Sequence, residues 1–158
     1  MQKIKTFLWF DHQAEEAVKF YCSLFEGSGI LDVSRYGDVG PGEPGRVMTI
    51  AYRLAGQEFI ALNGGPYPTG TPALSLFVNC KDQAEVDKLW DALLANGGSA
   101  QQCGWLSDKY GIPWQIIPER LSELLGDDDP ERAQRAMEAM LKMIKIDVPA
   151  LEKAAAGG

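Results

Sequence analysis

Apolar and polar positions follow the same order twice along this chain. Short apolar segments at 4–10 and 73–79 each precede a polar turn, and apolar residues then recur at helical spacing over 14–26 and 83–95. A short apolar run that ends at a turn is typical of a β-strand, and the spacing of three or four residues predicts amphipathic helices. Gln13 and Gly27 recur as Gln83 and Gly97, and the glycines end both helices. The sequence therefore contains a duplicated strand-helix unit.

The remaining pattern extends each copy by further strands. We predict strands at 30–36, 46–54 and 57–62, then near 100–105 and at 112–117, with helices at 120–125, 131–145 and 148–156. Glycine and proline gather between 63 and 72, which is linker composition. The prediction is one α+β domain over 1–158, with βαβββ modules at 1–66 and 73–118, a linker at 67–72 and a helical C-terminal extension at 119–158.

An apolar stripe rich in methionine runs along the helix predicted at 131–145. Its members are Ala133, Ala136, Met137, Met140, Leu141, Met143 and Ile144. Such a stripe either packs on its own domain or forms an interface with a second subunit. We keep both alternatives and expect a homodimer to which Met137, Met140 and Ile144 contribute.

Composition and charge describe a soluble globular protein. Hydrophobic residues make up 46% and charged residues 23% of the 158 positions. The net charge of −7 comes without a cluster of lysine and arginine, which argues against nucleic acid and membrane as partners. No signal region or apolar run of roughly 20 residues is present, so we expect a cytoplasmic protein. Cys22, Cys80 and Cys103 are odd in number and widely spaced, which fits neither a disulfide framework nor a zinc site.

Five stretches of the sequence are similar to one branch of a known superfamily. They lie at 61–66 (ALNGGP), 86–90 (VDKLW), 103–108 (CGWLSD), 111–118 (GIPWQIIP) and 142–147 (KMIKID). Together with the duplicated module they resemble the PhnB-like branch of the vicinal oxygen chelate superfamily, which includes glyoxalase I and bleomycin-binding proteins. Many members of this branch carry the label 3-demethylubiquinone-9 3-methyltransferase. The resemblance implies two curved mixed sheets that face each other around a cavity.

The resemblance also implies where a metal would bind in members that use one. Those positions fall on Thr6 and Ile60 in the first module and on Ser75 and Gln115 in the second. Hydroxyls, an alkyl group and one amide lack the basicity that holds a divalent transition metal. His12 is the single histidine and lies in a turn. We therefore expect no catalytic metal and no cofactor.

The residues also offer little support for methyl transfer or for a nucleophile. A nucleotide-like methyl donor favours a glycine-rich turn after the first strand, whereas this strand is followed by residues 11–14 without glycine. Cys103 beside Gly104 is a candidate nucleophile, although a structural cysteine is the simpler interpretation because no base is near in sequence. Asp108 with Lys109 is either an acid/base pair or a turn residue that binds its own backbone.

Strand alternation predicts which side chains line the cavity. The predicted wall consists of Thr6, Leu8, Phe10, Ile60, Ser75, Phe77, Asn79, Trp105, Gln115 and Ile117, whereas Trp9 and Trp114 are expected to face the helices. An apolar wall with a few hydroxyl and amide groups is typical of a small-molecule site. The alternative is that these side chains simply fill the space.

Two functions of different class follow. The first is metal-free binding of an apolar or aromatic small molecule. The second is a metal-independent enzyme that acts on a similar molecule with Gln115, Asp108 and Cys103.

Overall fold

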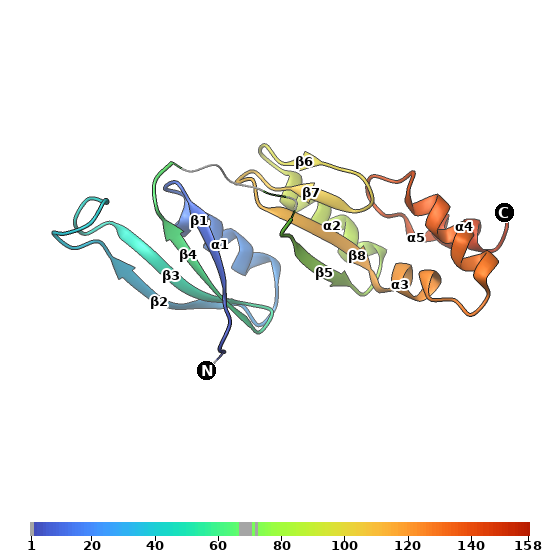
Figure 1. Ribbon diagram of the computed structural model, residues 1–158, viewed down its shortest axis with the longest axis horizontal. Helices are drawn as coiled ribbons and strands as arrows, with labels where there is room; N and C mark the ends of the chain where they lie inside the picture. Colours follow the sequence, from blue (N-terminus) through green and yellow to red (C-terminus); the bar gives the residue numbers. More distant parts are fainter. Residues whose placement is uncertain (1, 67–70, 72) are drawn as a thin grey trace. The chain divides into compact units, whose positions relative to one another are not determined.

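The chain folds as two compact units, each built around a four-stranded sheet. The computed structural model describes residues 2–66, 71 and 73–158. The units are Met1–Thr69 and Gly70–Gly158 (Figure 1). Most of the linker predicted at 67–72 lies outside the described residues. Each unit is taken by itself below.

The first unit contains one helix and four strands in the predicted order. The elements are β1 (Thr6–Phe10), α1 (Ala14–Leu24), β2 (Gly29–Arg35), β3 (Val47–Leu54) and β4 (Gln57–Asn63). The sheet order is β1-β4-β3-β2, with β1 parallel to β4 and the other pairs antiparallel. Ala55 and Gly56 form the tight turn of the β3–β4 hairpin, and both have positive φ, as hairpin turns require.

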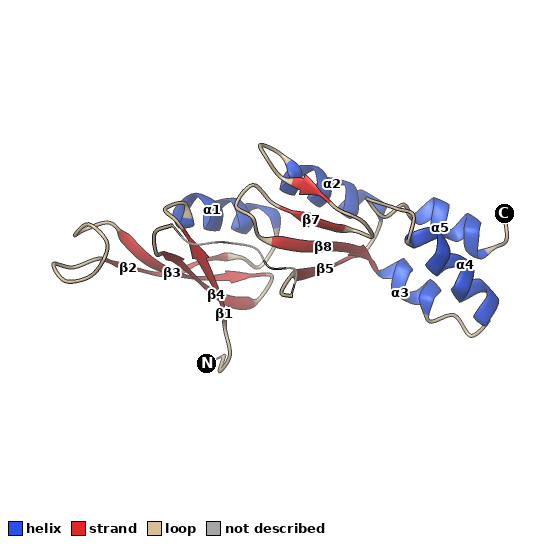
Figure 2. Ribbon diagram, turned by 45° about the horizontal axis from the view of Figure 1, so that its top comes forward, coloured by secondary structure: helices blue, strands red, loops and turns tan. Residues whose placement is uncertain are grey.

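Helix α1 covers one face of this first sheet (Figure 2). The helix buries Ala14, Ala17, Val18 and Tyr21, and the sheet buries Phe10, Ile50, Tyr52, Phe59 and Ala61 beneath it. Burying a large apolar side chain contributes about 1.5 to 3 kcal/mol. The apolar positions of the helix and of the strands therefore form one core between α1 and the sheet.

The second unit repeats this arrangement. Its elements are β5 (Leu76–Cys80), α2 (Gln83–Leu94), β6 (Ser99–Ala100), β7 (Trp105–Ser107) and β8 (Pro113–Pro118), in the sheet order β5-β8-β7-β6. Helix α2 begins at an N-cap, Asp82, whose carboxylate accepts from the Glu85 amide at 2.9 Å. It packs Val86, Leu89, Trp90 and Leu93 on the sheet face that carries Leu106 and Trp114.

The C-terminal extension belongs to the second unit and follows β8 directly (Figure 1). It contains α3 (Glu119–Leu125), α4 (Pro130–Met140) and α5 (Val148–Ala155). A separate core joins these helices to the end of β8 and consists of Ile117, Leu121, Leu124, Ala136, Ile146, Leu151 and Ala155, with Met140 and Met143 packed against it. Within the described part of the chain, no helix has the length and apolar character to span a membrane.

The predicted fold class is confirmed, with two corrections to its elements. The chain is α+β, with a βαβββ module in each unit and helices at the C-terminus. The segment predicted as one strand near 100–105 is divided into β6 and β7, because Cys103 and Gly104 both have positive φ and form a turn before β7. The helix predicted at 131–145 ends at Met140, because the following backbone bonds to that turn instead of continuing the helix. The cavity expected between facing sheets stays a prediction.

Candidate functional site

An amide flanked by two aromatic side chains lies on the sheet of the second unit. In the strand register, Gln115 of β8 pairs with Phe77 of β5 on one side and with Trp105 of β7 on the other. Directly paired residues point to the same face of a sheet. The neighbouring residue Trp114 is 1% exposed on the face covered by α2, so Gln115 points to the face opposite α2. Phe77 is 52% exposed there.

Ser75 holds the Gln115 amide in a defined orientation. The Nε2 of Gln115 donates to the Ser75 hydroxyl at 2.9 Å. A glutamine amide has two N–H donors and a carbonyl acceptor, and Ser75 uses one of the donors. A second N–H and the carbonyl oxygen of the amide are the polar groups that this arrangement offers between the two aromatic side chains. This group of four residues, Ser75, Phe77, Trp105 and Gln115, is called the amide-aromatic face below.

The other two residues predicted for the cavity wall in this unit behave differently. Asn79 and Ile117 are partners in the β5–β8 register. Asn79 is exposed, whereas Ile117 is 5% exposed and packs in the core of the C-terminal extension. Ile117 therefore serves packing at this end of β8.

In the first unit the strand register separates the residues predicted for the cavity wall onto two faces of the sheet. Thr6 pairs with Phe59 and Leu8 with Ala61, both of which are buried, whereas Ile60 pairs with Phe7. Thr6 and Leu8, and with them Phe10, which is 2% exposed, therefore lie on the opposite face from Ile60. A slip of one residue exchanges the two faces of a strand. The repeat itself held the correct signal, since it aligns Phe7 with Phe77.

The two tryptophans expected to face the helices separate in the structure. Trp114 is buried at 1% exposure, as predicted. Trp9 is 39% exposed, and its indole nitrogen donates to the Gly65 carbonyl at 2.9 Å. Trp9 shares its sheet face with Phe7 and Ile60, so the prediction for Trp9 is wrong for the same reason of register.

Asp108 is a buried carboxylate that organises the turn between β7 and β8. Its Oδ1 accepts from the amides of Tyr110 at 2.9 Å and Ile112 at 3.1 Å, and its Oδ2 accepts from the Trp114 indole at 2.9 Å. The side chain is 3% exposed. Of the two roles left open for Asp108, this geometry supports the turn residue.

The cysteines are not arranged as nucleophiles. Burial raises the pKa of Cys80 to about 12, so its thiol stays neutral, and burial also raises the pKa of Cys22. Cys103 is partly buried and has φ of 59°, and its amide donates to the Met143 carbonyl at 2.8 Å. Cys103 therefore contributes to a turn through its backbone.

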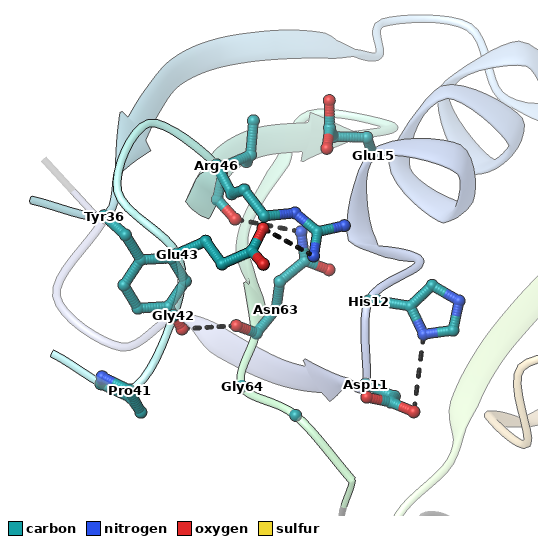
Figure 3. A pocket seen from close by; sticks show the side chains of 12 residues that line it. Asp11, His12, Glu15, Tyr36, Pro41, Gly42, Glu43, Arg46, Asn63 and Gly64 are labelled. Atoms are coloured by element: carbon teal, nitrogen blue, oxygen red, sulfur yellow. Dashed lines mark hydrogen bonds and ion pairs between the residues drawn. The ribbon is translucent and has the colours of Figure 1, made fainter.

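A polar pocket of about 250 Å³ in the first unit was missed by the sequence analysis (Figure 3). Asn63 organises it: the Asn63 Oδ1 accepts from the Ala14 amide at the start of α1 at 2.8 Å, and Nδ2 donates to the Val47 carbonyl at 3.1 Å. The Tyr36 hydroxyl donates to the Asn63 carbonyl at 2.5 Å. Asn63 is the last residue of β4, one position beyond the strand predicted at 57–62.

Charged side chains of both signs line this pocket. His12 lies 3.5 Å from Asp11, and Arg46 lies 3.8 Å from Glu43. The side chains of these pairs are largely exposed, so the pairs contribute little to stability. Glu15 also lines the pocket (Figure 3). The lining contains three carboxylates, one guanidinium and one imidazole, so acidic groups outnumber basic ones.

Metal ligands are not gathered anywhere in the described part of the chain. Across residues 2–66, 71 and 73–158, no three side chains of His, Cys, Asp or Glu lie close enough together to hold an ion. The expectation of a protein without metal or cofactor stays a prediction.

Fold and site together define a class: a two-module α+β protein whose second module presents an amide between aromatic side chains on one sheet face. The profile of the 3-demethylubiquinone-9 3-methyltransferase family matches residues 2–117. This chain belongs to that family, which confirms the resemblance to the PhnB-like branch.

One solved structure supports this assignment, and others are similar to the chain. A PhnB protein from Bacillus cereus is 40% identical, and the match covers 74% of this chain and 99% of that one with a TM-score of 0.67. A Pseudomonas aeruginosa protein is 23% identical, with 75% and 98% coverage and a TM-score of 0.61, which shows the shared fold. A glyoxalase/bleomycin resistance protein from Albidiferax ferrireducens T118 is 18% identical, with 72% and 95% coverage and a TM-score of 0.46. No curated protein matches the chain.

The C-terminal extension lies beyond the family match. The match ends at residue 117, so α3, α4 and α5 fall outside it. The similarity noted at 142–147 is therefore not part of the matched region. Nearly the whole B. cereus protein aligns with about three quarters of this chain.

Proposed function

We propose that this protein binds a neutral aromatic small molecule on the amide-aromatic face of its second unit, without a metal. The observation that carries the proposal is the position of Gln115 between Phe77 and Trp105, with Ser75 hydrogen-bonded to the amide. Flat aromatic side chains provide apolar contact area, and an oriented amide provides directional recognition.

The chemistry of the four residues indicates the class of ligand. None of them carries a charge, so the face favours a neutral molecule over an ion. The amide both donates and accepts, which fits a ring that carries a carbonyl, an amide or a hydroxyl group. Ligands of this class include aromatic amides, phenols and quinones.

The alternative of a metal-independent enzyme receives less support from the residues named for it. Asp108 is buried and bound to three donors, and Cys103 lies in a tight turn. A general acid or base must reach the proton it transfers. Binding without turnover is therefore the function that we propose.

Calorimetric titration with 2-naphthamide tests the proposal. This probe has a neutral double ring and a primary amide, and it does not react with thiols. Phe77→Ala should weaken binding roughly tenfold, since removing a ring that covers about 50 Å² of ligand costs about 1.3 kcal/mol. Gln115→Leu should weaken it by a similar factor, because the probe amide loses its partner.

Leu31→Ala is the matched control, since Leu31 is a 45% exposed apolar residue on β2 of the first unit. It should leave the affinity unchanged. The proposal fails if the wild type binds neither 2-naphthamide nor a panel of phenols and quinones, or if Phe77→Ala and Gln115→Leu bind as tightly as the wild type. Product analysis after overnight incubation with the bound compound distinguishes a binding protein from an enzyme.

A further inference from the structure

The C-terminal extension is hydrogen-bonded to the turn that leads into Trp105. Cys103 and Gly104 are the two central residues of this turn, with φ of 59° and 82°, and the Trp105 amide closes it on the Gln102 carbonyl at 3.2 Å. The amides of Cys103 and Gly104 donate to the carbonyls of Met143 and Ile144, both at 2.8 Å. Trp105 is the next residue and belongs to the amide-aromatic face.

This turn is unfavourable in isolation. Positive φ at both central residues is the combination of a type I′ turn, which favours Asn-Gly, and a cysteine in the first position is strained there. The Gly104 carbonyl accepts from the Ile116 amide at 2.8 Å, next to Gln115. The hydrogen bonds from the extension therefore stabilise a turn conformation that the sequence Cys103-Gly104 does not favour by itself.

Gln83 holds the extension in place from helix α2. Its Nε2 donates to the Ile146 carbonyl at 3.0 Å, and its Oε1 accepts from the Val148 amide at 2.7 Å. The same Nε2 lies 2.9 Å from Asp87 Oδ1, which also pairs with Lys145 at 2.8 Å. The hydrogen bond from Lys145 lowers the pKa of Asp87, so the Asp87 carboxylate is ionised and pairs with Lys145 at neutral pH.

We propose that residues 143–148 of the extension position the Cys103–Gly104 turn, and through it Trp105, and that Gln83 is the positioning residue that holds them there. That Trp105 contacts a ligand rests on the function proposed above. That the extension positions the turn does not depend on that function. The segment that positions Trp105 in the amide-aromatic face thus lies outside the part of the chain that matches the family.

The test compares Gln83→Leu with Gln134→Leu in the full chain. Both glutamines donate to a carboxylate four residues later on a helix, Gln83 to Asp87 and Gln134 to Glu138, but Gln134 lies on an exposed face of α4. Residue-resolved NMR measures hydrogen exchange of the Cys103 and Gly104 amides. It also records the indole N–H resonance of Trp105, assigned by its loss in Trp105→Phe.

In Gln83→Leu we expect the two turn amides to exchange roughly tenfold faster, because local opening of the turn becomes easier. The Trp105 indole resonance should move, and the dissociation constant for 2-naphthamide should rise at least about threefold, as expected for a less ordered site. In Gln134→Leu the amide exchange, the Trp105 resonance and the dissociation constant should match those of the wild type.

Unchanged exchange at the turn in a folded Gln83→Leu would overturn the inference. Faster exchange with an unmoved Trp105 resonance would overturn it too, because the extension would then only add stability. If the wild type binds no probe, the proposed function fails, and exchange and the Trp105 resonance still decide the inference. Should Gln83→Leu not fold, Lys145→Gln removes the ion pair with Asp87 alone, and the same changes, smaller in size, are required of it.

Discussion

At the scale of single residues, Asp108 shows how one buried side chain fixes the end of a strand. Its two oxygens accept from two backbone amides and from the Trp114 indole, which connects the turn to the largest buried side chain of the second sheet. A buried carboxylate is stable only when such donors replace water. The same strand then presents Gln115 to the opposite face, so Asp108 acts on the site through the position of β8.

Asp108→Asn is expected to lower the free energy of unfolding by about 2 kcal/mol. One oxygen becomes an N–H₂ group, so a donor then faces a donor inside the protein. Urea unfolding followed by tryptophan fluorescence measures this loss. Asp38→Asn, at an exposed loop position, is the control and should change stability very little. A loss below about 0.5 kcal/mol in Asp108→Asn would contradict the structural role.

At the scale of elements, the register of a strand decides what its residues can do. The face of β1 was assigned incorrectly, although the boundaries of the strand were close to those observed, because alternation leaves the choice between two faces open. The apolar content of β1 does not resolve that choice, since Phe7, Leu8, Trp9 and Phe10 are consecutive. Only pairing with β4 assigns Phe10 to the core and Phe7 to the uncovered face.

The turn before β7 gives a prediction at this scale. A side chain at Gly104 would have its Cβ 2.8 Å from Ile117 Cδ1 and 3.1 Å from the Ile116 carbonyl, at a φ of 82°. Gly45 has a similar φ of 86° but no atom within 4 Å of that position. Gly45→Ala should cost about 1 kcal/mol for the backbone alone.

Gly104→Ala should cost about 2 kcal/mol more than Gly45→Ala, because the crowding adds to the backbone strain. Thermal unfolding of the two variants measures the difference. Equal losses of stability in the two variants would contradict this prediction. They would mean that the side chains around Gly104 make room for the added methyl group without cost.

At the scale of the whole molecule, the extension adds exposed apolar side chains to the second unit. The stripe predicted on one long helix is divided: Met140 and Met143 pack on the core, whereas Met137, Leu141 and Ile144 are 40%, 57% and 55% exposed. We propose a homodimer in which these three exposed residues are covered, and Met140 is no longer expected at the interface.

Sedimentation velocity tests the homodimer. The wild type should sediment as a dimer at about 10 µM, and Leu141→Ser with Ile144→Ser should raise the dissociation constant at least about tenfold, since two apolar side chains lose their cover. Val39→Ser is the control, since Val39 is a 93% exposed apolar residue outside the extension. A wild type that is monomeric at this concentration removes the proposal.

The sequence by itself determined the order of most elements and the duplication, because strand and helix periodicities and turn residues are local properties of the chain. The family followed from the resemblance of five short stretches. Tertiary structure decided which face each strand presents, where the helix after Pro130 ends, that Asn63 organises a pocket and that Asp108 organises a turn. These outcomes depend on partners distant in sequence, such as Phe59 for Thr6 and Met143 for Cys103. Local patterns contain no information about such partners. The sequence therefore predicted Ser75, Phe77, Trp105 and Gln115 as wall residues, and strand pairing showed that they are neighbours on one face.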